Sequence, residues 1–219
     1  RALVENSLKD VPVFIVGNGP SLDGLIDIIK EHQVNQYLET LYPGETDVVT
    51  LDNIALWESP DSNAMNDKIV VSLLNLDEEP TLRNNPNKRF QNGQTVYQNT
   101  PVNVNLYVLF SSNRSTYSKS LTSLSEIIQF FQGKRVFNQT NTPKNPTVSA
   151  LDALSEFSFT TTLFTPTFEQ LNYVWGTLGG KSLPSVLYKV SLIPIERTSV
   201  QKKAPVITTV NSDQKVTAL

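Results

Sequence analysis

Residues 116–132 carry the clearest hydrophobic pattern in the chain. Gly133 follows directly and is a suitable C-terminal cap for a helix. Apolar side chains recur in this segment at intervals of three and four residues, which align them along one face of an α-helix; they are Tyr117, Leu121, Leu124, Ile128 and Phe131. The pattern predicts a helix whose apolar stripe lies in the core.

A second, shorter helix is predicted after Thr167. Gln170 stands three residues later, at the spacing of a capping box, and Gly179 and Gly180 mark the end of the segment. We expect Trp175 to lie in the core rather than at an interface. The whole apolar stripe expected for this helix consists of Phe168, Leu171, Val174, Trp175 and Leu178.

Alternating apolar and polar residues predict strands, because successive side chains of a strand point to opposite faces. The clearest run is 102–110, where Val, Leu and Phe alternate with Asn and Tyr. Other strands or extended segments are expected at 11–16, 48–57, 68–76, 151–163 and 186–193. In the 68–76 strand, one face is expected to carry Ile69, Val71 and Leu73.

Two polar segments, 77–94 and 136–148, are expected to be long loops. Regular strand–helix–strand units of the kind that build parallel sheets are few. The order of elements therefore favours an α+β fold: a mostly antiparallel sheet with two or three helices on one face, long loops and a C-terminal arm.

The predicted helix over 21–41 changes phase half-way. Its first apolar stripe is Leu22, Leu25, Ile26 and Ile29, and its second is Val34, Tyr37, Leu38 and Leu41. Since each residue advances about 100° around a helix, the second stripe is rotated by roughly 100° from the first. A π-helical turn near Gln33 would absorb one extra residue. A junction between segments of different origin, or two separate helices meeting near residue 32, would also explain the slip.

Composition narrows the classes of function. The chain has 219 residues and a net charge of −3, and no basic stripe of the kind that binds nucleic acid is present. It has no cysteine and a single histidine, His32, which argues against a zinc site and a hydrolytic triad. No apolar run approaches the length of a membrane span. We expect neither a metal nor a cofactor.

The segment PVFIVGNGPSLDGLIDIIKEHQ resembles the Gly-x-Gly-Pro-Ser-Leu segment of pterin diphosphokinase-like and glycosyltransferase-like proteins. In that family Gly17, Gly19, Pro20 and Ser21 would shape a loop that binds a nucleotide phosphate at a helix N-terminus. Such a loop needs a regular sheet downstream, and the sequence supplies none. We interpret the segment as a strand-to-helix turn, with a nucleotide-phosphate-binding transferase as the alternative.

Residues 34–200 resemble a different family, the N-terminal domain of cap, or tail-terminator, proteins of contractile injection systems. The resemblance rests on VNLYVLFSSNRSTYSKSLTSLSEIIQFFQGKRVF (104–137), TPTFEQLNYVWGTLGGKSLPSVLYKVSLIPIE (165–196) and NDKIVVSLLNLDEEPTLRN (66–84). We therefore divide the chain into residues 1–33 of uncertain origin, a cap-like domain over 34–196 and an arm over 197–219.

This resemblance implies a structural subunit without catalytic activity. It would form a ring with copies of itself, expected to be a hexamer, and contact the inner tube protein and the sheath protein of a phage-tail-like particle. It implies assembly in the cytoplasm and later release as part of the particle. A baseplate or adaptor protein of the same particle is the alternative.

Two kinds of residue are candidates for contacts between subunits. An acidic run and nearby basic residues in 77–94 could form ion pairs between adjacent copies around a ring; they are Asp77, Glu78, Glu79, Arg83, Lys88 and Arg89. A strand-like run in the arm could add to the sheet edge of a neighbour, or serve as a linker; its candidates are Val206, Ile207 and Val210.

Overall fold

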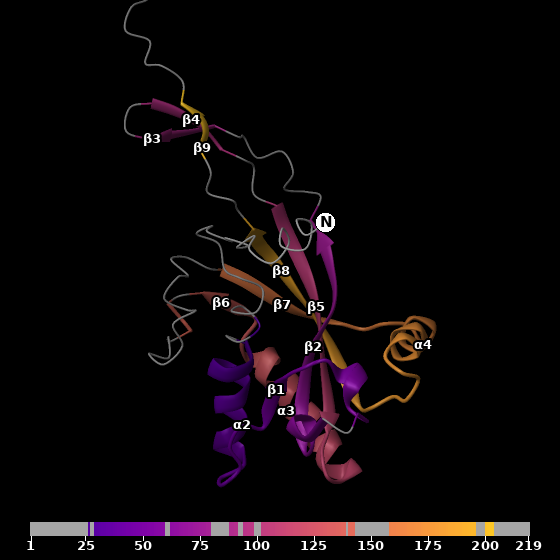
Figure 1. Ribbon diagram of the computed structural model, residues 1–219. Helices are drawn as coiled ribbons and strands as arrows, with labels where there is room; N and C mark the ends of the chain where they lie inside the picture. Colours follow the sequence, from indigo (N-terminus) through magenta and orange to yellow (C-terminus); the bar gives the residue numbers. More distant parts are fainter. Residues whose placement is uncertain are drawn as a thin grey trace, which may run out of the picture.

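Six strands form the main sheet of the computed structural model, which describes residues 26, 29–59, 62–79, 88–91, 94–98, 102–138, 140–142, 158–195 and 200–203. The strand order is β1-β2-β5-β8-β7-β6, and every pairing is antiparallel except that of β1 with β2. Figure 1 shows the sheet curling along its length. These strands are β1 (Val49–Leu51), β2 (Lys68–Glu78), β5 (Val102–Asn113), β6 (Val136–Asn138), β7 (Ser158–Phe164) and β8 (Ser185–Ile195). The expected α+β fold with a mostly antiparallel sheet is confirmed.

A second, three-stranded sheet lies beyond the upper end of the main sheet in Figure 1. It consists of β3 (Lys88–Gln91), β4 (Gln94–Gln98) and β9 (Val200–Lys203). The loop predicted over 77–94 is therefore wrong in part, because β2 continues to Glu78 and β3 and β4 form a hairpin. The arm predicted from residue 197 likewise contributes a strand, β9, to its own chain. The predicted strand over 11–16 lies outside the described residues.

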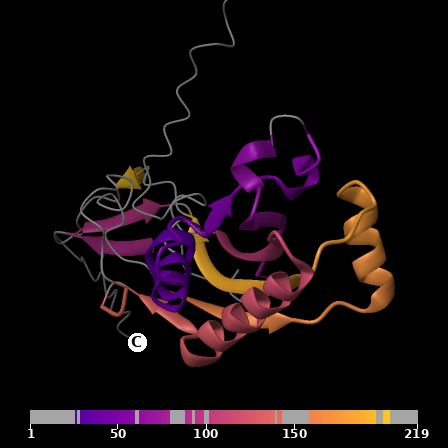
Figure 2. The same cartoon turned by 90° about the horizontal axis from the view of Figure 1, so that it is seen from below.

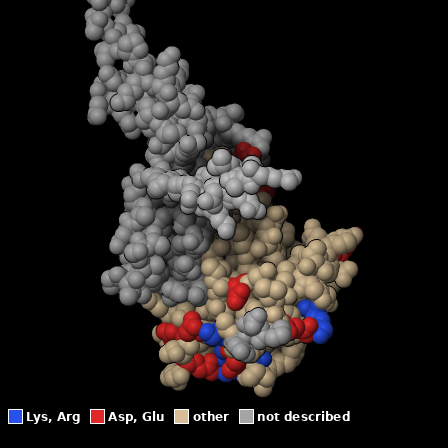
Figure 3. Space-filling view, in the orientation of Figure 1, with Lys and Arg blue, Asp and Glu red and all other residues tan. Residues whose placement is uncertain are grey.

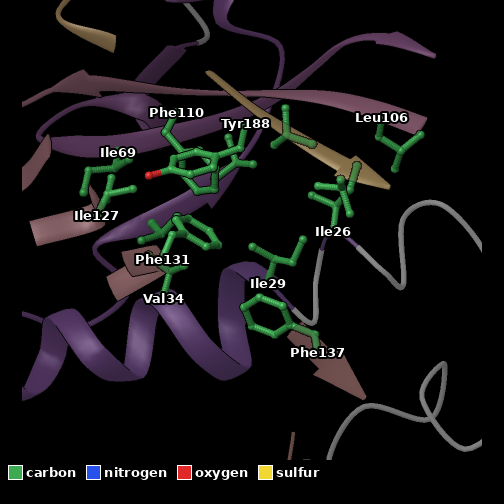
Figure 4. Close-up of a cluster of buried hydrophobic side chains, with 14 of the residues drawn as sticks. Ile26, Ile29, Val34, Ile69, Leu106, Phe110, Ile127, Phe131, Phe137 and Tyr188 are labelled. Carbon is green, nitrogen blue, oxygen red and sulfur yellow. The ribbon is translucent and has the colours of Figure 1, made fainter. Parts of the chain in front are cut away.

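One face of the main sheet holds the larger core. Helix α3 (Tyr117–Gly133) and the helix formed by η1 (Lys30–Asn35) and α2 (Gln36–Leu41) cover this face. Figure 4 shows aromatic and aliphatic side chains from the helices and the sheet meeting there. Burial raises the pKa of Tyr188 in this core to about 12, so its hydroxyl is neutral at physiological pH. The largest buried members are Phe110, Phe137, Phe159, Ile29, Leu38, Ile69, Leu106 and Ile127.

The reverse face of the sheet holds a smaller core that α4 (Phe168–Thr177) covers. Trp175 of α4 is 4% exposed and confirms its expected core position. The capping box at Thr167 and Gln170 is present. Phe168, the first residue of α4, is however 93% exposed and does not belong to this core. The buried members of this core are Ile54, Met65, Val70, Leu109, Trp175 and Leu187.

The stripe predicted for α3 is wrong at three positions. The helix begins after Thr116, whose hydroxyl accepts the Lys119 N–H. Its buried face consists of Ser120, Ser123, Leu124, Ile127 and Phe131. Small serines let the helix approach the sheet closely, and a hydrophobic pattern does not count them as core residues. The exposed stripe is Tyr117 at 70%, Leu121 at 45% and Ile128 at 41%.

The phase slip in the N-terminal helix is a π-helical turn. Residues 30–35 are π-helical and continue directly into α2, so the explanation by two separate helices is wrong. Ile29 on one side of the turn and Val34 and Leu38 on the other all lie in the same core cluster. The extra residue is thus absorbed without rotating the second stripe away from the sheet.

Two predicted strands differ from the structure for local reasons, one in its extent and the other in the side chains that it buries. Only 49–51 of the predicted segment 48–57 is a strand, because Asn53 caps the short 3₁₀-helix η2 (Ile54–Leu56). In β2, Leu73 is 40% exposed although Ile69 and Val71 are buried. An irregularity in the β2–β5 register between residues 73 and 75 interrupts the alternation there. A second 3₁₀-helix, η3 (Ser62–Met65), precedes β2.

Candidate assembly surfaces

The candidate acidic run lies at the end of β2 rather than in a loop. Asp77 and Glu78 are exposed, and they pair in register with Asn105 and Val104 of β5. Glu79 follows the strand and is half-buried, and its carboxylate accepts the Asn105 amide at 2.9 Å. The run is therefore held at the end of β2, where the strand pairs with β5.

The candidate basic residues of the same segment lie in the small sheet. Lys88 is opposite Tyr97, and Arg89 is opposite Val96, across the β3–β4 hairpin. Strand β9 then places two further basic residues in the same sheet. Lys202 is opposite Tyr97 and Lys203 is opposite Val96, so Lys88 and Arg89 on β3 and Lys202 and Lys203 on β9 lie on the two strands that flank β4.

Lys202 and Lys203 are not among the candidates that the sequence indicated. They follow the acidic run by more than 120 residues, and no short-range pattern indicates that β9 pairs with β4. The structure thus brings Lys88 and Arg89 together with residues of the arm. Arg83, Val206, Ile207 and Val210 lie outside the described residues, and their roles stay predictions.

A network of charged residues lies at the end of the main sheet that is away from the small sheet. Arg114, whose side chain is 2% exposed, forms ion pairs with Glu45 and Asp67 and donates to the Asp67 carbonyl. Lys119 joins the same two carboxylates, at 2.7 Å from Glu45 and 3.8 Å from Asp67. Tyr42 lies under the guanidinium at 5.9 Å and donates to Glu126.

This network shifts the pKa of both carboxylates. Hydrogen bonds from Lys119 and then Arg114 hold the pKa of Glu45 below its ordinary 4.5. Burial raises the pKa of Asp67, but the Ser115 N–H and the charges of Arg114 and Lys119 outweigh it, so the pKa lies below its ordinary 3.8. Both carboxylates are therefore anionic near neutral pH and can form ion pairs with Arg114 and Lys119.

An apolar and uncharged surface lies between α3, β7 and α4. It carries Ile128 of α3, Leu163 of β7 at 48% exposure, and Leu171 and Val174 of α4. In Figure 3 the charged side chains gather at the lower end of the described surface, while the surface over α4 is almost free of them. Interfaces between proteins are depleted of charge in this way.

The described residues hold no group of three or more His, Cys, Asp or Glu that could bind a metal ion. Within the same part of the chain, none of the helices has the length and hydrophobicity needed to cross a membrane. The Gly17–Ser21 segment lies outside the described residues, and the phosphate-binding alternative stays untested.

A family model described as the Pvc16 N-terminal domain matches residues 28–209, which is most of the chain. The chain belongs to this family. The match begins inside the N-terminal helix and includes the π-helical turn, both sheets and β9. Among curated proteins, none is similar enough to be matched.

Two solved structures share the fold of this Pvc16 N-terminal domain protein. One is the tube-terminating cap of the anti-feeding prophage, with 18% identity, a TM-score of 0.59, and coverage of 90% of this chain and 62% of that chain. The other is the PVC sheath/tube terminator of an extracellular contractile injection system, in the extended state. It has 17% identity, a TM-score of 0.53, and coverage of 84% of this chain and 63% of that chain.

At these identities the likeness shows a shared fold. The chain spans less than two thirds of the length of both structures. The resemblance to cap and terminator proteins that residues 34–200 predicted is confirmed by the Pvc16 family match and by these two folds. The division of the chain at residues 33 and 196 stays a prediction.

Proposed function

We propose that this chain is a structural cap subunit that forms a ring, expected to be a hexamer, and terminates the inner tube and sheath of a contractile injection particle. Membership of the Pvc16 N-terminal domain family carries the proposal. The names of the two similar structures, a tube-terminating cap and a sheath/tube terminator, give the same role for those proteins.

The mechanism is geometric and requires no catalytic residue. A helical polymer presents the same surface at its growing end, so each added layer creates the site for the next. A terminator binds that end with one surface and presents no copy of it on the other. The subunit would assemble in the cytoplasm and leave the cell as part of the particle.

Head-to-tail contacts around a ring require two different surfaces on each copy. The described residues offer such a pair in the acidic end of β2, with Asp77 and Glu78, and the basic small sheet. We propose that the acidic end of one copy faces the basic sheet of the next. Charges at the rim of an interface set orientation and association rate more than affinity.

Two measurements test the proposed role. Light scattering after gel filtration should give about six times the monomer mass. A tag fused to the chain should appear by electron microscopy at one end of assembled particles, on the tube and sheath. A strictly monomeric protein that is absent from particle ends would contradict the proposal, and labelling of the baseplate end would favour an adaptor role.

A further inference from the structure

Strand β7 is paired along its outer edge only over its first half. Strand β6 pairs with residues 158–160, and the Thr161 N–H then donates to the Arg135 carbonyl at 2.8 Å. Backbone groups alternate in direction along a strand, so the Leu163 N–H and C=O point to the same edge as those of Thr161. Within the described ranges nothing pairs with β7 at this edge beyond Thr161.

Two neighbouring pockets lie along this open edge, and Ile128 and Leu163 line both of them. One of about 180 Å³ is on the α3 side, where Ile128, Leu163 and Tyr188 line it. The other, of about 220 Å³, is on the α4 side, where Phe164 and Val174 line it. Figure 2 shows β7 running from beside α3 towards α4. A strand added at this edge would direct alternate side chains into the two pockets.

The lining of the two pockets selects for an uncharged strand. Arg135 is the single charged residue among the side chains that line them. A charged side chain placed in the rest of this apolar lining would lose its hydration without gaining a partner. The edge therefore fits a short, β-branched segment without charge.

The sequence contains such a segment directly after β9. Residues 204–212 read APVITTVNS and have no charge, with β-branched residues from 206 to 210. We propose, on the basis of the ring function above, that residues 206–210 of a second copy of this chain pair as a strand with β7 at Thr162–Phe164. Strand addition of this kind combines backbone hydrogen bonds with side-chain pockets.

The short reach of the chain after β9 shows that residues 206–210 would pair with the β7 of a neighbouring copy. Thr162–Phe164 pair with Leu187–Lys189, and β8 continues from there over six more residues to Ile195, which spans about 20 Å. Strand β9 lies still further on, beyond the upper end of β8 (Figure 1). Val206 follows Lys203 by three residues, a reach of about 10 Å. The segment therefore cannot return to the β7 of its own chain.

The absence of cysteine from the sequence allows a direct test. Full-length protein with Leu163→Cys is mixed with full-length protein with Ile207→Cys, assembled and oxidised. We expect a covalent dimer of one copy of each variant. The variant carrying both substitutions should give a ladder of covalent multimers on a denaturing gel.

The matched control replaces Leu163→Cys by Leu41→Cys. Leu41 is similarly exposed, at 43%, but ends α2, which lies on the far side of α3 from α4 (Figure 2). This control should form no link with Ile207→Cys. Equal linking in both mixtures, no link at all, or an intrachain link in the doubly substituted variant would each overturn the proposal.

The same samples distinguish this proposal from the ring function. Rings that form and cap particles without a 163–207 link would contradict strand exchange and leave the cap role standing. Monomers that never reach a particle end would contradict the cap role itself.

Discussion

Arg114 joins segments that are far apart in sequence. Its guanidinium is buried against Glu45 after α2, Asp67 before β2 and the ring of Tyr42. The carboxylates are 36% and 49% exposed, so water stabilises them if the arginine is lost. We expect Arg114→Met to lower the free energy of unfolding by about 1–3 kcal/mol, less than a fully buried pair would cost.

Urea unfolding followed by circular dichroism measures this change. Lys181→Met is the matched control, because the Lys181–Glu58 pair is exposed at 68% and 49% and should contribute only about 0–1 kcal/mol. Equal effects of the two substitutions would show that burial of Arg114 adds nothing.

The same network predicts a loss of stability in acid. Glu45 and Asp67 have lowered pKa values in the folded protein. Protonation therefore favours the unfolded chain, and the stabilisation is present above the unfolded values of 4.5 and 3.8 and disappears as pH falls through the folded values. We expect the free energy of unfolding to decrease below about pH 4.5.

Glu45→Gln tests this pH dependence. The variant should be less stable than the parent at pH 7 and should lose less stability between about pH 5 and pH 3, because one titrating group is absent. Chemical unfolding at each pH gives the comparison. A pH profile parallel to that of the parent would show that Glu45 does not contribute to the acid transition.

At the level of single residues, sequence predicted the capping box of α4 better than the end and the buried face of α3. Thr167 and Gln170 cap α4 as their spacing indicated, whereas Gly133, the expected cap of α3, is the last residue of that helix, and Lys134 follows as its C-cap. Ser120 and Ser123 face the sheet, while Tyr117, Leu121 and Ile128 are exposed. Which face of a helix is buried depends on the partner surface, and the hydrophobic pattern of one element does not contain that information.

At the level of elements, the π-helical turn keeps two apolar stripes on one core. Gln33 lies in the turn and accepts a hydrogen bond from Lys134 at the end of α3. Deleting Gln33 would leave Ile26, Ile29 and the shifted Val34 and Leu38 at ordinary α-helical spacing. We expect the deletion to be tolerated, at a cost of about 1 kcal/mol for the lost hydrogen bond.

Deletion of Ser125 in α3 is the matched control. Ser125 is exposed, and its removal would rotate Ile127 and Phe131 by about 100° out of the core. That loss of burial costs several kcal/mol, so we expect this variant not to fold. Thermal unfolding of the two deletion variants compares their stabilities. Equal destabilisation would contradict the role of the π-helical turn.

Strands with strong alternation were predicted well, and short paired strands were not. Strands β2, β5 and β8 have long apolar runs that indicate them from sequence. Strands β3, β4 and β9 have four, five and four residues and are polar, and pairing with distant residues defines them. The same cause hid the grouping of Lys88, Arg89, Lys202 and Lys203 in one small sheet.

At the level of the whole molecule, a ring requires that every copy presents complementary surfaces to two neighbours. The acidic end of β2 and the basic small sheet differ in charge and lie on separate elements of one chain. Reversing one surface alone places like charges opposite each other at every contact. This repulsion weakens ring assembly at low salt and weakens it less at high salt, because ions screen the charges.

This reasoning predicts the behaviour of two charge-reversed proteins. One carries Asp77→Lys and Glu78→Lys, and the other reverses all four basic residues of the small sheet, Lys88→Glu, Arg89→Glu, Lys202→Glu and Lys203→Glu; neither should form rings alone at low salt. Mixed in equal amounts, they should form rings in which the two variants alternate, because every contact then joins opposite charges. Alternation closes only in a ring with an even number of subunits, which a hexamer satisfies. Light scattering of each variant and of the mixture measures the outcome, and rings from either variant alone would show that these surfaces do not meet.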